Sequence, residues 1–63
     1  MAKVETNRRR IVSRLSSEGW VSEGGAKHEK FARADRPGVK IMVPRHERLT
    51  IGVALNIARA AGW

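Results

Sequence analysis

The chain has 63 residues, with 13 Lys or Arg against six Asp or Glu, a net charge of +7 and no cysteine. This length supports one small domain spanning residues 1–63, and the lack of cysteine excludes disulfide bonds and cysteine-ligated zinc. A charged start and the absence of a run of about 20 apolar residues exclude a secretory signal and a membrane helix, so we expect a cytoplasmic protein without membrane contact.

The excess of positive charge predicts a polyanionic partner. Nucleic acid is the leading candidate, although RNA, DNA and an acidic protein would all satisfy the same electrostatics. A surface that is basic only for solubility is the less favoured interpretation. Because a core of this size stabilises a chain by roughly 3–5 kcal/mol at best, we also expect a homodimer or a bound partner protein.

The first predicted element is a helix over residues 7–18. Apolar side chains recur there at helical spacing, and Gly19 stands where a helix ends. Arg10 and Arg14 lie one turn apart on an outer flank of this helix. They are therefore candidate contacts to a phosphate backbone.

Three strands are predicted next, over residues 20–23, 28–34 and 39–43. Pro37 and Gly38 occupy the central positions of a predicted type II turn, which makes the second and third strands a hairpin.

Alternation along these strands separates a core face from a solvent face. In the third strand Ile41 points toward the core and Lys40 away from it. In the second strand Phe31 points inward, so His28 and Lys30 lie on an outward, basic face. A bulge between them would reverse this assignment.

The last predicted element is a helix that follows the N-cap Thr50, runs to about residue 61 and closes at Gly62. Apolar residues cover most of its circumference, so it should be buried on more than one side, against the sheet and against the first helix or a second subunit. Trp63 would add a final anchor. The order is α-β-β-β-α, an α+β fold that resembles a double-stranded-RNA-binding domain, with a three-stranded antiparallel sheet and two helices packed on one face.

Four blocks of the sequence resemble the HicA family, also called YcfA-like: residues 18–20, 25–31, 43–46 and 60–62. The most specific parts are the His28-x-x-Phe31 spacing and the Val-Pro-Arg-His block, and the resemblance covers nearly the whole chain. Members of this family are small mRNA interferases with this fold, encoded beside a HicB antitoxin. The resemblance thus implies the toxin of a type II toxin–antitoxin system, an endoribonuclease that inhibits translation and is neutralised by a HicB-type protein.

The family's catalytic histidine lies in a Gly-Ser-His motif just before an aromatic strand residue. His28 matches this histidine by its spacing to Phe31. The two positions before it depart from the motif, because Ala26 and Lys27 stand where glycine and serine are typical.

Elementary chemistry agrees with a catalytic role for His28. RNA carries its own nucleophile, the 2′-hydroxyl, so cleavage needs only proton transfer and stabilisation of charge on the phosphate. An imidazole with a pKa of about 6.5 can transfer the proton near neutral pH, and no metal or other cofactor is required. We predict His28 as the general base or acid. The predicted RNA-binding residues are Lys27, Lys30, Lys40, Arg10 and Arg14.

Other interpretations stay open. In one of them, His28 is an exposed strand residue without a function. The protein would then be a non-catalytic RNA-binding module that uses the same basic face, or an interaction protein of a toxin–antitoxin complex. His46 is a candidate second proton-transfer group, although a phosphate contact or a structural hydrogen bond fits it better. A zinc site that uses both histidines is disfavoured, because they have no recognised ligand spacing.

Overall fold

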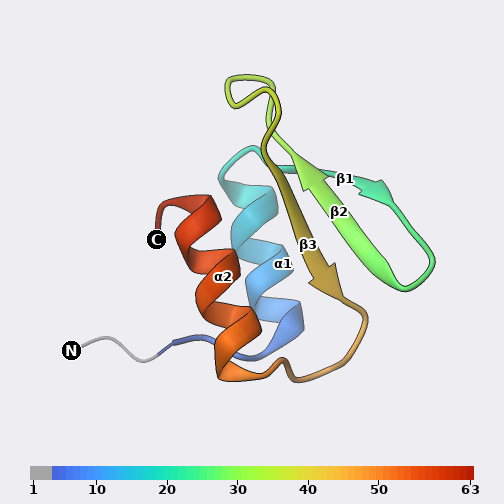
Figure 1. Ribbon diagram of the computed structural model, residues 1–63, viewed down its shortest axis with the longest axis vertical. Coiled ribbons are helices and arrows are strands. Elements are labelled where there is room, and N and C mark those ends of the chain that lie inside the picture. Colours follow the sequence, from blue (N-terminus) through green and yellow to red (C-terminus); the bar gives the residue numbers. More distant parts are fainter. Residues whose placement is uncertain (1–3) are drawn as a thin grey trace.

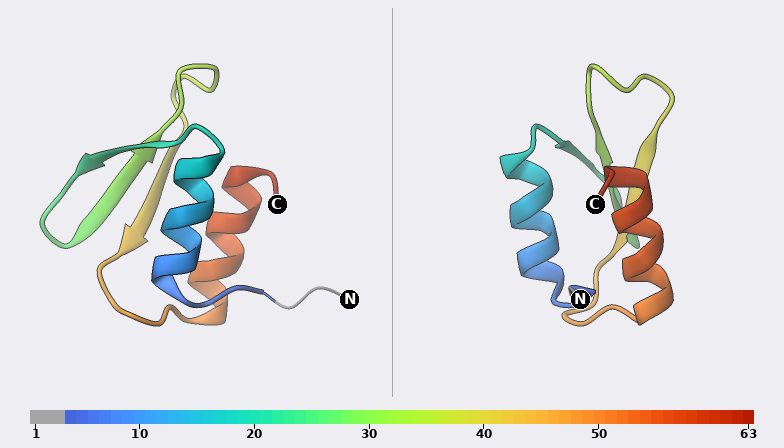
Figure 2. Two further views of the ribbon diagram at one scale, coloured as in Figure 1. Left: turned by 180° about the vertical axis from the view of Figure 1, so that it is seen from behind. Right: turned by 90° about the vertical axis from the view of Figure 1, so that its left-hand side faces the viewer.

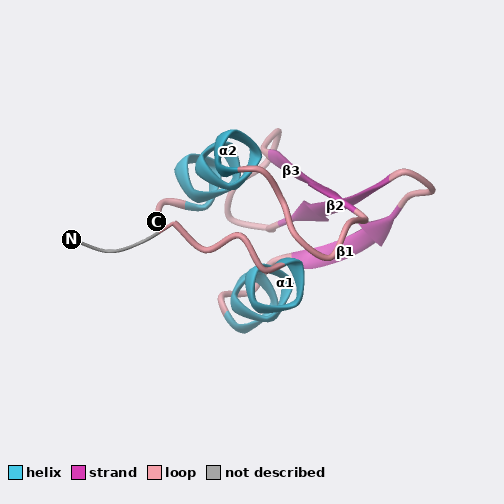
Figure 3. Ribbon diagram, turned by 90° about the horizontal axis from the view of Figure 1, so that it is seen from below, coloured by secondary structure: helices cyan, strands magenta, loops and turns pink. Residues whose placement is uncertain are grey.

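The computed structural model describes residues 4–63 and has the predicted order α-β-β-β-α (Figure 1). Its elements are α1 (Arg8–Ser17), β1 (Val21–Gly24), β2 (His28–Ala32), β3 (Lys40–Pro44) and α2 (Ile51–Ala61). The strands form one antiparallel sheet in the order β1-β2-β3, and both helices lie on the same side of it (Figure 3). The predicted α+β layout is confirmed.

Helix α2 begins after Thr50 and ends at Gly62 as predicted, and α1 lies within the predicted range 7–18, with Asn7 as its N-cap. The side chain of Asn7 accepts a hydrogen bond from the Arg10 backbone N–H at 3.2 Å, and that of Thr50 accepts one from the Val53 N–H at 3.2 Å. Gly62 closes α2 in the left-handed conformation. The two helices lie side by side, and the loop between β2 and β3 projects beyond them (Figure 2).

The β2–β3 loop contains the predicted turn. The Val39 N–H donates to the Arg36 carbonyl at 3.2 Å, which places Pro37 and Gly38 at the two central positions. Gly38 has a φ of 85°, the positive value that a type II turn requires there. The second strand ends at Ala32, two residues earlier than predicted, because the chain already turns toward this loop.

The register of β2 with β3 is regular from His28↔Pro44 to Ala32↔Lys40. The inward and outward assignments along β2 therefore hold: Phe31 is 1% exposed, whereas His28 and Lys30 are exposed. The bulge lies instead in β1, where the pairing with β2 shifts between Ser22 and Gly24.

The core lies between the sheet and the two helices, and every element except β1 contributes a buried side chain to it. Its members are Ile11, Leu15, Trp20, Phe31, Ile41, Val43, Leu49, Ala54, Ile57 and Ala61. Helix α2 buries one face, but Ile51 at its start is 63% exposed. The burial on more than one side that was expected for this helix is thus incomplete at its start.

Trp63 anchors the C-terminal end, as predicted. It packs against the core, and its indole N–H donates to the Glu18 carboxylate at 2.6 Å. The Arg14 guanidinium lies 4.2 Å from the centre of the Trp63 ring. These contacts join the C-terminal ends of α1 and α2. Within residues 4–63, neither helix has the length and apolar content to cross a membrane.

Candidate functional site

The side of the sheet opposite the helices is open to solvent, and we call it the outer sheet face, defined by His28, Lys30, Lys40 and Met42. All four side chains are exposed. Alternation along β2 and β3 puts them there, because Phe31 and its partner Ile41 point to the helix side and are buried. Lys27 lies in the loop just before His28 and is also exposed.

Lys40 is engaged on this face by an ion pair. Its ammonium lies 2.9 Å from the Glu23 carboxylate of β1, across the width of the sheet. Both side chains are about half exposed, and such a pair contributes only about 0–1 kcal/mol. Lys40 can therefore leave the Glu23 carboxylate and bind a phosphate with little loss of stability. Lys30 makes no ion pair within the part of the chain that is described.

Arg10 and Arg14 lie elsewhere. They belong to α1, on the helix side of the sheet, and are separated from His28 by the core (Figure 3). Arg14 is also occupied by Glu18, at 3.2 Å, and by the Trp63 ring. The structure thus puts Lys30 and Lys40 on the same sheet face as His28, although Lys40 pairs with Ala32 at the other end of β2. The contact of the predicted lysines and arginines with RNA stays a prediction.

The backbone makes a tight turn at Gly25, just before His28. Gly25 has a φ of 126°, and a Cβ atom added there would lie 2.1 Å from the His28 carbonyl oxygen. No side chain fits in that space, so Gly25 sets the path of the backbone into the candidate catalytic residue.

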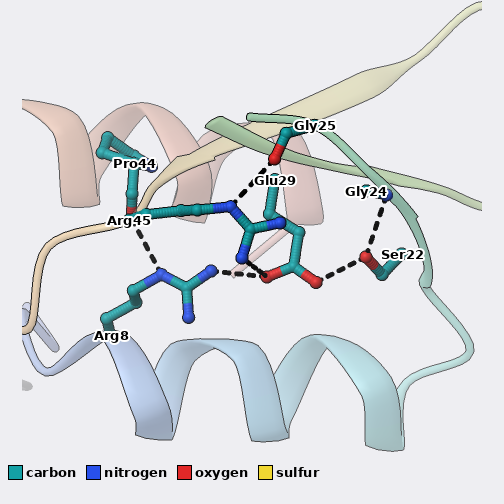
Figure 4. Close-up of polar contacts among 7 residues, drawn as sticks. All are labelled: Arg8, Ser22, Gly24, Gly25, Glu29, Pro44 and Arg45. Atoms are coloured by element: carbon teal, nitrogen blue, oxygen red, sulfur yellow. Dashed lines mark hydrogen bonds and ion pairs between the residues drawn. The ribbon is translucent and has the colours of Figure 1, made fainter. Parts of the chain in front are cut away.

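Behind this turn, on the helix side, Glu29 is the centre of a polar cluster (Figure 4). Its carboxylate accepts hydrogen bonds from the Arg8 guanidinium at 2.5 Å and from the Ser22 hydroxyl at 2.5 Å. The Arg45 guanidinium is 3.9 Å away and donates to the Gly25 carbonyl at 2.9 Å. The cluster therefore ties α1 and β1 to the turn that carries His28.

Two further contacts extend this cluster to the end of β3. Arg8 donates from Nε to the Pro44 carbonyl at 2.8 Å, and Pro44 pairs with His28 across the sheet. The hydrogen bond from Ser22, with help from that of Arg8, lowers the pKa of Glu29 although partial burial opposes the shift. Glu29 is thus held as a carboxylate.

We predict that Glu29→Gln lowers the free energy of unfolding at neutral pH by about 1–3 kcal/mol, because Arg8 and Arg45 lose their counter-charge. Since the pKa of Glu29 is lowered in the fold, its contribution is complete above the ordinary value near 4.5 and is lost as the pH falls below that value. Urea unfolding of both proteins at pH 7 and pH 3 should show a difference that shrinks in acid.

The matched control for this variant is Glu23→Gln, which removes the exposed ion pair with Lys40. It should change the free energy of unfolding by less than about 0.5 kcal/mol at either pH. A Glu29→Gln effect of equal size at pH 7 and pH 3 would show that the carboxylate charge is not its source.

A second basic site lies at the start of α1. Arg8, Arg9, Arg45 and His46 line an open pocket of about 650 Å³ there. His46 is exposed, and its side chain makes no hydrogen bond to any residue from 4 to 63. The two histidines line different pockets.

The sequence interpretation missed the roles of Glu29 and its partners. One signal was present: alternation places Glu29 on the same side as Phe31, where an unpaired charge would be costly, so a partner was required. Which arginines supply it depends on how α1 and β3 cross β2.

No three His, Asp or Glu side chains among the described residues lie close enough together to hold a metal ion. The chain matches no protein-family model. A comparison with curated proteins likewise gives no significant match.

Proposed function

We propose that this protein is an endoribonuclease of the mRNA interferase type, in which His28 transfers a proton. The observation that supports the proposal is an exposed imidazole on a sheet face that also carries Lys30 and Lys40, with Lys27 directly before it. A protein with a net charge of +7 attracts RNA, and an open face allows the strand to reach the imidazole.

The reaction needs only groups of the chain, the RNA and the solvent. His28 takes the proton of a 2′-hydroxyl, the 2′-oxygen attacks the adjacent phosphorus, and the bond from phosphorus to the 5′-oxygen breaks. The leaving 5′-oxygen takes a proton from solvent or from protonated His28. Lys27 and Lys30 stabilise the charge on the phosphate. The products end in a 2′,3′-cyclic phosphate and a 5′-hydroxyl.

We further propose the biological setting that the HicA resemblance implies. The enzyme would act as a toxin in the cytoplasm, cleave mRNA and inhibit translation, and be neutralised by a HicB-type antitoxin. The exposed Val21 and Met42 give the sheet an apolar component that a protein partner or a second copy could cover.

One observation favours a second candidate, a non-catalytic RNA-binding module. The two histidines line different pockets: His28 lies in the one beside α2, and His46 in the one with Arg8 and Arg9. A general acid would then have to be His28 itself or water, and a face with lysines and a single imidazole also suits binding alone.

Cleavage of a synthetic single-stranded RNA distinguishes the two candidates. We expect the purified protein to cut the RNA equally well in EDTA and in magnesium, and to leave the same sequence intact when every ribose lacks its 2′-hydroxyl. Mass spectrometry should find cyclic phosphate ends on the products. RNA that is bound but stays whole in both buffers would favour the binding module.

A further inference from the structure

An open pocket of about 340 Å³ lies between the edge strand β3 and helix α2. One wall is made by the sheet residues His28, Met42 and Pro44, and the other by Val53, Asn56 and Ala60 of α2. In the ribbon view β3 is the strand nearest to α2 (Figure 1). His28 thus belongs both to the outer sheet face and to this pocket.

The lining of the pocket is mostly apolar with one neutral amide. Met42 is 45% exposed, and Val53 and Ala60 are half-buried, so their surfaces are available to a ligand. Binding sites for small molecules have this make-up and typically a volume of roughly 300–1,000 Å³. The flat apolar faces and polar edge of a nucleobase match such a pocket.

Asn56 supplies the amide. Its side chain is exposed and makes no hydrogen bond within residues 4–63. It lies in the interior of α2, where asparagine is among the weaker helix formers, and it caps neither end. Helix stability therefore does not account for an asparagine at this position, whereas an amide can pair with the donor and acceptor groups of a base edge.

A lysine and a histidine also line the pocket. Lys40 lines one part of it, and His28 lines another. A base held against Asn56 would carry a ribose and a phosphate toward the outer sheet face, where the reacting phosphate of the proposed function lies.

We propose that this pocket binds one unpaired nucleobase of the RNA, next to the phosphate at His28, and that Asn56 is a specificity-determining residue that reads the edge of the base. The proposal rests on the proposed function for the position of the phosphate. Met42 and Pro44 contact the face of the base, and the Asn56 amide donates to and accepts from its edge.

Nuclear magnetic resonance of the wild-type protein tests the proposal directly. The sequence has two asparagines and no glutamine, so only Asn7 and Asn56 contribute side-chain amide signals. We expect millimolar AMP, GMP, CMP or UMP to shift the Asn56 amide pair in a saturable way, with different affinities for the four bases. The Asn7 pair reports separately on the basic pocket at the start of α1, because Asn7 also lines that pocket.

Ribose 5-phosphate is the matched ligand without a base, and it should leave the Asn56 signals in place. An equal shift with ribose 5-phosphate, or no Asn56 shift with any of the four nucleotides, would overturn the proposal. In wild type and Asn56→Leu, cleavage of RNAs that differ in one base at the cut site gives a second measurement. We expect the variant to lose about tenfold or more in base preference, and an unchanged preference would also overturn the proposal.

These measurements separate this proposal from the proposed function. If RNA is cut in a His28-dependent way while none of the four nucleotides shifts the Asn56 amide signals, the base-binding proposal is wrong and the ribonuclease proposal is supported. If RNA stays intact while the Asn56 amide responds to bases, the pocket is supported and the protein is a binding module.

Discussion

His28→Ala should lower the rate of RNA cleavage by about 10²–10⁴-fold, the usual contribution of a positioned general acid or base. The imidazole is exposed, and no described residue forms a hydrogen bond to its side chain, so its removal should leave the fold intact. The measurement is the initial rate on labelled RNA, together with the urea unfolding midpoint. In cells, induction of wild type should arrest growth and induction of the variant should not.

The matched control is His46→Ala, which removes the other imidazole of the chain from the pocket beside Arg9. We expect that variant to keep its cleavage rate to within a few-fold, because a phosphate contact of one side chain is worth far less than the proton transfer itself. Equal cleavage by wild type and His28→Ala would rule out the catalytic assignment, and a large loss in His46→Ala would move the proton transfer to the second basic pocket.

Gly25→Ala should destabilise the protein by at least about 2 kcal/mol and also reduce cleavage. Two costs combine at this position: alanine rarely adopts a φ of 126°, and its Cβ would lie 2.1 Å from the His28 carbonyl oxygen. The backbone must move, and with it the start of β2. Urea unfolding measures the first effect and the cleavage rate the second.

The neighbouring glycine provides the control. Gly24 also has a positive φ, of 80°, but a Cβ atom there meets nothing within 4 Å. Gly24→Ala should therefore cost only the backbone term, about 1–2 kcal/mol, and should affect cleavage less. If both variants lose the same stability, the close approach to His28 is not what constrains Gly25.

The secondary structure was predictable because its signals lie within a few residues of one another. Asn7 and Thr50 cap the helices through bonds to N–H groups three residues later. The alternation that exposes His28 and buries Phe31 is likewise a property of one strand. The ends of the strands were predicted less accurately, as the early end of β2 at Ala32 shows. The length of a strand depends on how far its partner strand continues to pair with it.

The candidate site was predictable only in part. The side of the sheet that carries His28, Lys30 and Lys40 follows from alternation and a regular register. The sequence also predicted Arg10 and Arg14 of the first helix as RNA contacts. Arg10 and Arg14 belong to α1, which lies on the helix side of the sheet, and Arg8 of the same helix forms an ion pair with Glu29.

The order of the elements, their caps and the face on which His28 lies can be read from the amino-acid sequence, since each depends on spacing and chemistry along a short stretch. Three other features can be seen only in the folded chain. They are the partners of Glu29, the hydrogen bond from Arg45 to the Gly25 carbonyl, and the pocket that both Asn56 and His28 line. Arg8 and Glu29 are 21 residues apart, and Arg45 and Gly25 are 20 apart. Contacts between residues so far apart in the sequence arise from how the helices and strands are arranged in the fold, which no local pattern specifies.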